Sequence, residues 1–368
     1  GRAATASGAS SGSGVTRPGI PQSIAIVTDA WHPQTNGVVR TLSTTCELLR
    51  QWGHDVTVIS PDQYWSVPAP TYPEIRLALT WPGAAGRALA RIKPDAVHIA
   101  TEGPLGFAAR RYCMNRKVPF TTAYHTQFPD YFARRTGLSP KWFWPYIRRF
   151  HRPAQRIMVA TETIRAQLRE QGLTHLHHWS RGVDLSCFSP DAPRPREYEG
   201  LEGPILLYVG CVAVEKNIEA FLSSSHPGTK VVVGDGPARA SLEAKFPEAH
   251  FLGKRTGADL AGCYAHADAF VFPSKTDTFG LVMIEALACG TPVAAFRVPG
   301  PIAILEDSVG AMSDNLDAAI SAALTRDREK CARFGAGYSW EAATRQFVQG
   351  LVALEEEEST SLQAAPAF

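Results

Sequence analysis

The chain has 368 residues, of which 45% are apolar and 20% charged, an ordinary balance for a soluble globular protein. This length exceeds what one hydrophobic core usually serves and suits two α/β domains of roughly 170 residues each. No apolar run approaches the length of a membrane-spanning helix. Seven cysteines without a C-x-x-C pair argue against a disulfide framework or a zinc site, and for a reducing cytoplasm.

The formal net charge of +2 conceals an asymmetry between the two halves of the chain. Residues 1–200 carry 24 basic and 14 acidic side chains, a charge of +10, whereas the remainder carries 13 and 21, a charge of −8. A basic first half indicates that one domain meets an anionic surface. Lipid headgroups and nucleic acid are the candidate anionic surfaces. No motif typical of a nucleic-acid-reading fold is present, so we expect no nucleic-acid partner.

Residues 1–20 are rich in glycine, serine and alanine and lack an apolar stretch, which predicts a disordered leader and not a secretory signal. Short apolar runs bounded by turn residues then alternate with segments of helical periodicity. This alternation predicts buried parallel strands joined by crossover helices. The strands expected in the first half are 23–28, 55–60, 96–100, 120–124 and 156–160, with a helix over 39–52 that ends at Gly53.

Two segments near the middle of the chain interrupt this pattern. The histidines of residues 174–179 look like a metal-binding run, but they lack carboxylate or thiolate partners nearby, so a surface turn is the better interpretation. Residues 191–200 are rich in proline and charge and predict a linker.

After the linker the strand pattern resumes at residues 204–209, 230–234, 250–252 and 269–272. We therefore expect two Rossmann-like domains, over residues 21–190 and 203–338, joined near 190–203. A nicotinamide dehydrogenase is disfavoured because neither half has G-x-G-x-x-G followed about 20 residues later by a ribose-binding acid. Ligands of open parallel sheets bind beyond the carboxyl ends of the strands, so the active site is expected in the cleft between the two sheets.

Two features of the first half suggest binding chemistry. In residues 28–40, Asn36 and Gly37 form a tight turn that leaves N–H groups unpaired at a helix start, which is an anion site. His125 follows the end of an expected strand, from which its side chain can reach the cleft. The competing interpretations are a plain βα turn and a structural histidine.

The most informative segment is residues 272–293, where an apolar strand runs through a short polar loop into a helix. Asp277 and Glu285 stand eight residues apart in this segment, so both can face one crevice. Free N–H groups and the positive end of the helix dipole point at that crevice, which suits an anionic ligand with hydroxyls, such as a nucleotide sugar. On spacing alone, an ordinary βα unit with one solvated and one capping carboxylate would explain the same residues.

The wording of this segment resembles the E-x7-E signature of family four of the retaining GT-B glycosyltransferases, with Asp277 in place of the first glutamate. Four further segments, residues 28–40, 122–131, 180–190 and 208–217, carry the same resemblance, which covers about residues 23–350. It implies an α/β GT-B fold, in which two Rossmann-like doubly wound parallel-sheet domains face each other across a cleft. It also implies that a final helix, over residues 339–358, crosses back to the first domain, leaving residues 359–368 as a disordered tail.

The resemblance implies roles for individual residues. Glu285 would bind the donor ribose, and Lys216 would bind the donor pyrophosphate. His125 and Asp277 would hold the sugar near the reacting carbon as catalytic residues, in a front-side attack that needs no metal. The donor site would comprise Gly37, Cys211, Lys216, Leu252, Gly253, Lys254, Phe279, Gly280, Leu281 and Glu285. The acceptor would meet Asp29, Asn36, Tyr124 and Thr126.

One donor position departs from the family pattern, which places an arginine where this chain has Cys211. An arginine here would offer a fork of N–H donors, and losing this charge-assisted contact costs about 1.5–3 kcal/mol, or some ten- to hundredfold in binding or rate. Either another cation, such as Lys254 or Arg255, replaces it, or the protein is a donor-impaired relative.

Residues 141–152 combine five aromatic side chains with four Lys/Arg side chains and a histidine, which suits an anionic membrane surface, although aromatic packing into the domain core explains them nearly as well. The wording of the whole chain looks most like the bacterial diacylglycerol and sulfolipid glycosyltransferase branch. The resemblance thus implies transfer of a hexose or hexuronic acid from a nucleotide-diphosphate sugar, UDP-linked by preference, to a lipid acceptor. The enzyme would lie on the inner face of the cytoplasmic membrane. The alternatives are an α-mannosyltransferase using GDP-mannose, and a nucleotide-sugar epimerase on the same scaffold.

Overall fold

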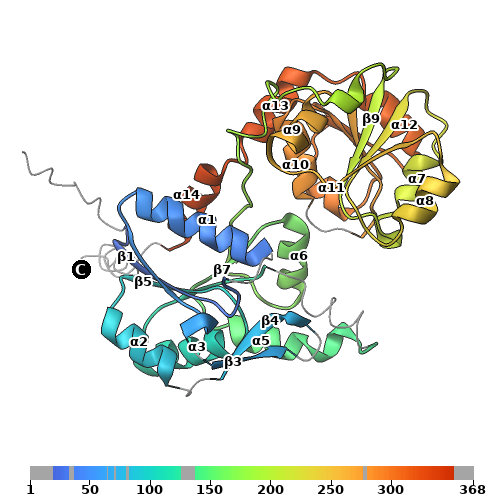
Figure 1. Ribbon diagram of the computed structural model, residues 1–368. Helices are drawn as coiled ribbons and strands as arrows, with labels where there is room; N and C mark the ends of the chain where they lie inside the picture. The colour runs from blue at the N-terminus through green and yellow to red at the C-terminus, as the bar shows by residue number, and fades with distance from the viewer. Residues whose placement is uncertain are drawn as a thin grey trace, which may run out of the picture.

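The protein is described by a computed structural model, which covers residues 20–32, 37–63, 65–69, 72–79, 83–125, 137–276 and 280–351. Two α/β domains follow each other along the chain and lie apart in Figure 1, the first in blue to green and the second in yellow to orange. Each is built on one six-stranded parallel sheet.

The first sheet has the strand order β2-β1-β5-β6-β7-β8. Most of the strands, such as β1 and β7, are short and largely buried apolar runs, as parallel strands covered by helices must be, whereas the edge strand β8 is only partly buried. A separate antiparallel hairpin, β3–β4, lies between β2 and the rest of the domain in sequence. The strands are β1 (Ser23–Val27), β2 (Asp55–Ile59), β3 (Trp65–Ala69), β4 (Tyr72–Leu79), β5 (Ala96–Ile99), β6 (Thr121–Ala123), β7 (Arg156–Val159) and β8 (Leu176–His178).

Helices connect these strands and cover both faces of the sheet. Side-chain caps mark some of their starts: Thr161 accepts from Ile164 N at the start of α6. The helices are α1 (Gly37–Gln51), α2 (Ala84–Ile92), α3 (Pro104–Arg116), α5 (Trp144–His151) and α6 (Glu162–Glu170), with short 3-10 turns η1 (Pro61–Gln63) and η2 (Pro140–Trp142).

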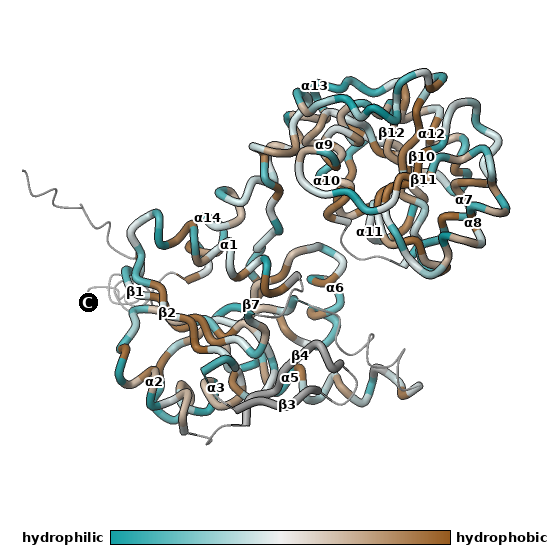
Figure 2. Tube along the Cα trace, in the orientation of Figure 1, coloured by the Kyte–Doolittle hydropathy of each residue, from teal (hydrophilic) through white to brown (hydrophobic). Residues whose placement is uncertain are grey.

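The second sheet has the order β11-β10-β9-β12-β13-β14, the doubly wound arrangement of a dinucleotide-binding fold. Figure 2 shows β10, β11 and β12 largely in brown, which marks the apolar residues at the centre of this domain. The strands are β9 (Ile205–Val209), β10 (Thr229–Val233), β11 (His250–Gly253), β12 (Ala269–Phe272), β13 (Val293–Ala295) and β14 (Gly310–Met312).

The second domain continues to alternate strands with short helices. Asn315 and Asp327 cap two of them through their side chains. The elements are η3 (Arg196–Tyr198), η4 (Val214–Lys216), α7 (Ile218–Leu222), α8 (Arg239–Lys245), α9 (Gly257–Ala265), α10 (Leu281–Ala288), α11 (Pro299–Ile304), α12 (Leu316–Ala323) and α13 (Arg328–Ala336).

The segment expected as a linker packs firmly on the second domain. Phe188, Ala192 and Tyr198 are buried in the same apolar cluster as the β9 and β12 side chains. The Tyr198 hydroxyl donates to the Cys263 carbonyl, at 2.7 Å. The chain therefore joins the second domain at about residue 183, before the proline-rich stretch begins.

The last described helix, α14 (Trp340–Gly350), returns to the first domain (Figure 1). Phe347 is buried in the cluster that contains the β1 side chains Ile24 and Ile26, and the helix contacts α1, β7 and β8. The two chain segments that connect the domains lie side by side, since Val183 and Ser339 form a parallel bridge. None of the helices in the described parts of the chain is long and apolar enough to cross a membrane.

Candidate functional site

The second domain has a topological switch point between β9 and β12. Ligands of open parallel sheets bind beyond the carboxyl ends of the strands at such a point. Cys211 and Lys216 lie in the segment after β9, and Gly280 and Leu281 lie after β12, where Leu281 begins α10. The structure thus brings predicted donor-binding residues from two segments to one edge of the sheet.

Three loops at this edge pack against one another through their backbones. Gly210 N donates to the Val233 carbonyl, and Gly234 N donates to the Gly253 carbonyl. A Cβ atom on Gly234 would lie 1.8 Å from the Gly210 carbonyl oxygen, so the close approach requires glycine there. This packing places Gly253 in one row with the loop that carries Cys211.

Lys216 ends η4, directly after the first strand of the domain. The next residue, Asn217, has a left-handed backbone, and its side-chain amide donates to the Pro273 carbonyl at 2.9 Å. Pro273 follows β12, so this bond joins the two segments across the switch point. The bond holds the segment of Lys216 against the first residues after β12, whereas Asp277 and Phe279 lie outside the described residues.

Glu285 lies on α10 and is 7% exposed. The Tyr264 hydroxyl donates to its Oε2 at 2.8 Å. Burial raises the pKa of the Glu285 carboxyl above its ordinary value, while the hydrogen bond from Tyr264 and the positive charge of Arg40 act in the opposite direction. Arg40 belongs to α1 of the first domain, so a positive charge of one domain acts on a carboxylate of the other. The sequence prediction missed Arg40, whose signal is a basic residue just inside the helix that follows an anion-binding turn.

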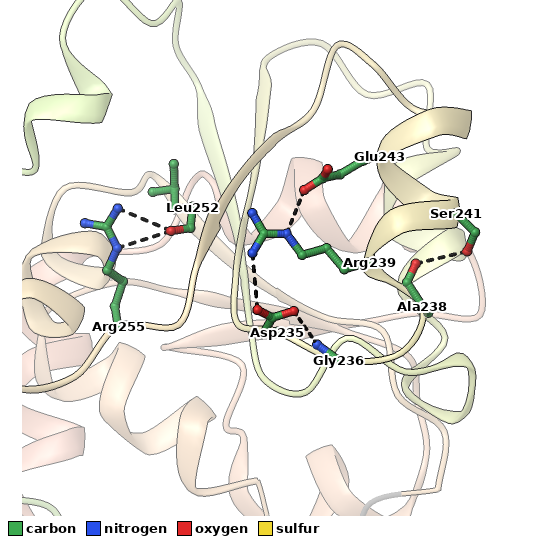
Figure 3. Close-up of polar contacts among 8 residues, drawn as sticks. All are labelled: Asp235, Gly236, Ala238, Arg239, Ser241, Glu243, Leu252 and Arg255. Atoms are coloured by element: carbon green, nitrogen blue, oxygen red, sulfur yellow. Dashed lines mark hydrogen bonds and ion pairs between the residues drawn. The ribbon is translucent and has the colours of Figure 1, made fainter.

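Leu252, Gly253 and Lys254 lie at the end of β11, toward the outer edge of the sheet. Figure 3 shows Arg255 folded back on this strand end, with Nε and Nη2 donating to the Leu252 carbonyl at 3.4 and 3.3 Å. Arg255 also pairs with Glu197, at 2.6 Å. Of the two cations proposed to replace a missing arginine, Arg255 is therefore committed to these contacts, whereas Lys254 is exposed.

A second guanidinium borders the same strand end. Arg239 lies between two carboxylates (Figure 3): its Nε donates to Glu243 at 2.7 Å and its Nη1 donates to Asp235 at 3.3 Å. A Cβ atom on Gly253 would lie 3.3 Å from Arg239 Nη1. The strand end that carries the predicted donor residues Leu252 and Gly253 is thus bordered by an arginine that is paired with a carboxylate on each side.

Cys211 is exposed in the loop between β9 and η4, and its carbonyl accepts from the Tyr208 hydroxyl. We expect Cys211→Arg to bind the donor about tenfold more tightly, because an arginine here would restore a charge-assisted contact to the pyrophosphate. The shift of the donor titration midpoint in a thermal unfolding assay measures this, with Cys211→Ala as the matched control. An unchanged midpoint would contradict the prediction that Cys211 weakens donor binding.

His125 follows β6 at the edge of the first domain that carries the carboxyl ends of the strands. Its Nε2 is buried without a hydrogen-bond partner in the described part of the chain. Its ring meets the Trp179 ring edge-on, with 5.3 Å between centroids. Burial lowers the pKa of His125 to about 3, assisted by the positive charge of Arg181. The imidazole is therefore neutral at physiological pH and can orient a substrate or donate a hydrogen bond, but it carries no positive charge.

Asp29 follows β1 and is 4% exposed. Its carboxylate accepts from Leu105 N at 2.8 Å, from Gly106 N at 3.3 Å and from the Thr101 hydroxyl at 2.7 Å. Desolvation raises the pKa of Asp29, and these hydrogen bonds partly offset the rise. The carboxylate thus stabilises the N-terminus of α3, which the sequence did not predict. Its predicted contact with the acceptor stays a prediction.

Tyr124 lines a narrow pocket together with His125, Thr41, Ser180 and Arg181, although its ring is almost fully buried. The ring stacks on Trp144 of α5 at 6.3 Å between centroids. Its predicted contact with the acceptor likewise stays a prediction.

A buried network that the sequence prediction missed lies beside Tyr124. His151 is fully buried, with Nδ1 at 2.7 Å from the Thr122 hydroxyl and Nε2 at 2.8 Å from the Glu102 carboxylate. The Tyr146 hydroxyl donates to the Glu102 carbonyl. Glu102 follows β5 and borders the Asp29 site, so this network ties α5 to the edge where an acceptor is expected.

Four predicted site residues cannot be placed. Asn36, Thr126, Asp277 and Phe279 lie outside the described residues. Gly37, which is described, begins α1 as expected for an anion-binding helix start. Within the described residues, no three His, Cys, Asp or Glu side chains are grouped as a metal ligand set.

Two family models match this chain. Residues 35–186 match the model described as Glycosyltransferase Family 4, and residues 203–326 match Glycosyl transferases group 1. A GDP-mannose-dependent alpha-mannosyltransferase of Mycobacterium tuberculosis is 34% identical over 302 residues, which cover 76% of this chain and 80% of the relative. Sulfoquinovosyl transferase SQD2 of Arabidopsis thaliana is 34% identical over 71% of this chain and 57% of its own length.

A further relative, the alpha-monoglucosyldiacylglycerol synthase of Streptococcus pneumoniae, is 26% identical over 75% of this chain and 71% of its own length. Among solved structures, sucrose-phosphate synthase from Thermosynechococcus elongatus superposes with a TM-score of 0.68. It shares 22% sequence identity and covers 94% of this chain and 100% of its own chain, so this likeness concerns the fold.

Proposed function

The chain belongs to glycosyltransferase family 4 and has the GT-B fold, and we propose that it transfers a hexose or hexuronic acid from a nucleotide-diphosphate sugar to a lipid hydroxyl with retention of anomeric configuration. The resemblance seen in the sequence is thereby confirmed at the level of family, fold and enzyme class. The donor, the acceptor and the roles of the individual residues belong to the proposal.

The observation that carries the proposal is the placement of Glu285. It is a buried carboxylate at the switch point of the second sheet, and Arg40 of the first domain contributes to its field. A ribose whose hydroxyls bond to Glu285 would place its pyrophosphate near the helix start at Leu281 and near Lys216. The sugar would then extend toward the first domain and His125.

The proposed reaction needs no protein nucleophile. The acceptor oxygen forms a bond to the anomeric carbon on the face from which the nucleoside diphosphate leaves, and the bond from that carbon to the phosphate oxygen breaks. A leaving phosphate oxygen takes the proton of the acceptor hydroxyl. His125 orients the sugar and Lys216 stabilises the charge that develops on the leaving group.

A panel of UDP-, GDP- and ADP-sugars tests the donor site. A ligand that binds the native state raises the melting temperature, so the preferred donor should raise it most. Incubation with that donor and diacylglycerol, followed by NMR of the product, then tests the reaction and its stereochemistry. A free epimerised nucleotide sugar would indicate an epimerase, and no shift with any donor would indicate a donor-impaired relative.

A second candidate is an α-mannosyltransferase that uses GDP-mannose. It is favoured by the 34% identity to a relative with that name. The same panel separates the two candidates, because a guanine donor should then give the largest shift.

For the lipid acceptor we propose that the enzyme binds the inner face of the cytoplasmic membrane through a surface formed by η2 and α5, here called the aromatic-basic surface. Trp142 is 75% exposed, and Lys141, Arg149 and Arg152 are exposed around it. Every charged residue between Asp130 and Glu162 in the sequence is basic. Trp144, Ile147 and Phe150 form the buried face of α5, so core packing accounts for these residues and the membrane proposal rests on the exposed ones. An anionic bilayer complements the exposed ones.

We expect Trp142→Ala to reduce flotation with phosphatidylglycerol-containing vesicles severalfold, because an indole that inserts at the interface is lost. Lys141→Gln should weaken the same binding about fivefold, in a salt-sensitive manner. Matched controls are Trp52→Ala, which removes a 40% exposed tryptophan at the end of α1, and Arg91→Gln on α2. The surface assignment fails if the controls lose as much binding as the two η2 variants, Trp142→Ala and Lys141→Gln. Acceptor-free vesicles keep this test independent of the proposed reaction.

A further inference from the structure

Residues 179–183 form the first connection between the two domains, here called the connecting strap. They follow β8, the edge strand of the first sheet, and run to the point where the chain joins the second domain. In the sequence, residues 180–190 carried the family resemblance without a role for any single residue. In the structure the strap lies directly against His125.

Two residues of the strap contact His125. The Trp179 ring meets the imidazole edge-on at 5.3 Å and 71°, and the Arg181 Nη2 donates to the His125 backbone carbonyl at 3.4 Å. Trp179 is buried, and both residues line the narrow pocket that contains the imidazole. One contact constrains the ring and the other constrains the backbone that carries it.

The strap is held from behind by α14. Ser180 N donates to the Gln346 side-chain carbonyl at 2.8 Å, and the Trp179 ring packs on Phe347 with 4.8 Å between centroids. Farther along, Val183 N donates to the Tyr338 carbonyl at 2.8 Å. The returning helix therefore holds Trp179 and Ser180, and the residue pair before it holds Val183.

The groups around the imidazole also determine its charge. Arg181 approaches from the strap and His98 from β5, while Tyr124 on the same strand end lines the pocket. His98 is fully buried, and burial lowers its pKa well below the ordinary value. Burial is the largest cause of the low pKa of His125, and the positive charge of Arg181 is the second. Loss of that charge therefore raises the pKa of His125.

We propose that the connecting strap positions His125 for glycosyl transfer, with Arg181 and Trp179 as positioning residues and Gln346 as the tie that holds them. This inference rests on the proposed role of His125. In this arrangement the imidazole stays neutral and fixed in orientation, and its buried Nε2 keeps a hydrogen-bonding position that no described residue uses. Fixed orientation is what a group acting on a transition state requires.

Arg181→Gln tests the proposal through kinetics. We expect a loss of about ten- to a hundredfold in kcat, with the KM for the donor changed by less than about threefold, because positioning and not binding is impaired. Arg165→Gln on α6 is the matched control, since it removes a cation from the same domain away from the His125 pocket. If instead KM rises and kcat holds, Arg181 contacts the donor directly and the proposal is wrong.

NMR of the ligand-free protein gives a readout that needs no substrate. The His125 ring signals, assigned by comparison with His125→Asn, should not titrate between about pH 5 and 8, where an ordinary histidine does. In Arg181→Gln the onset of titration should move to higher pH. An unchanged titration together with unchanged kcat would overturn the proposal, and because the titration does not depend on any reaction, it separates this result from a failure of the proposed function.

Gln346 allows a test outside the cleft. Gln346→Ala removes the acceptor of Ser180 N, whereas Gln346→Glu retains an oxygen at that place. We expect the alanine variant to lower kcat and the glutamate variant to restore most of it, at similar melting temperatures. Equal activity of wild type and Gln346→Ala would exclude a role of α14 in holding the strap.

Discussion

Glu285→Gln is expected to weaken donor binding by about ten- to a hundredfold, because a charge-assisted hydrogen bond to the ribose is worth about 1.5–3 kcal/mol. Glutamine keeps the volume of the side chain and an oxygen that can accept from Tyr264, so the fold should survive. Alanine would leave the buried Tyr264 hydroxyl without this acceptor and would mix a loss of stability with a loss of binding. Thermal unfolding across a donor titration measures the effect.

The control for this variant is Glu329→Gln, on the exposed surface of α13 away from the switch point. The binding should also depend on pH. Since the folded pKa of Glu285 is raised, the ribose-binding carboxylate is lost as the pH falls through a value above the ordinary 4.5. Donor affinity of the wild type should therefore decline in mildly acidic buffer, and the decline should disappear in Glu285→Gln. Unchanged donor affinity in the variant would refute the assignment of the ribose site.

His125→Asn is expected to lower kcat by about a hundred- to a thousandfold, the size of effect seen when one preorganised donor to a transition state is removed. The donor-induced rise in melting temperature should persist, because in the proposed site the second domain holds the nucleotide. Initial rates at saturating donor and acceptor measure the change.

His250→Asn is the control for this variant, since His250 is exposed at the opposite end of a second-domain strand. The low pKa of His125 also predicts how the rate depends on pH. The imidazole is neutral above about pH 3, so His125 contributes no acidic limb to the rate profile in the range where the protein is assayed. Retention of turnover in His125→Asn would remove His125 from the reaction.

Most strands of the two sheets were predicted from the sequence because parallel strands are continuous apolar runs, but β13 and β14 were not predicted. Residues 269–272 were expected as a strand and form β12 with the same limits, and 23–28 differs from β1 by one residue. The β3–β4 hairpin was not predicted. β8 was wrongly expected as a surface turn: Leu176–His178 pairs in register with β7, and His177 Nε2 contacts the Gln346 carbonyl at 2.7 Å. Because Gln346 lies far along the chain from His177, the sequence around β8 holds no local pattern that reveals this contact.

The candidate site likewise has features that the sequence predicts and contacts that only the tertiary structure shows. The start of α1 at Gly37 and the strand–loop–helix around Glu285 follow from local geometry, which sequence patterns record. The contact of Asp29 with α3, the Glu102–His151 pair and the packing of the strap on His125 each join residues more than 45 positions apart.

The sequence by itself therefore determined the two-domain α/β architecture, the family and the residues at the ends of the strands, because strand periodicity, turns and helix starts are local properties of the chain. Tertiary structure alone decided what those residues contact. It directed the Asp29 carboxylate to a helix N-terminus, committed Arg255 to Glu197, and placed Arg40 of one domain in the field of Glu285 in the other. Burial and charge proximity arise only when distant segments pack together, and they set the pKa values and orientations on which the proposed chemistry depends.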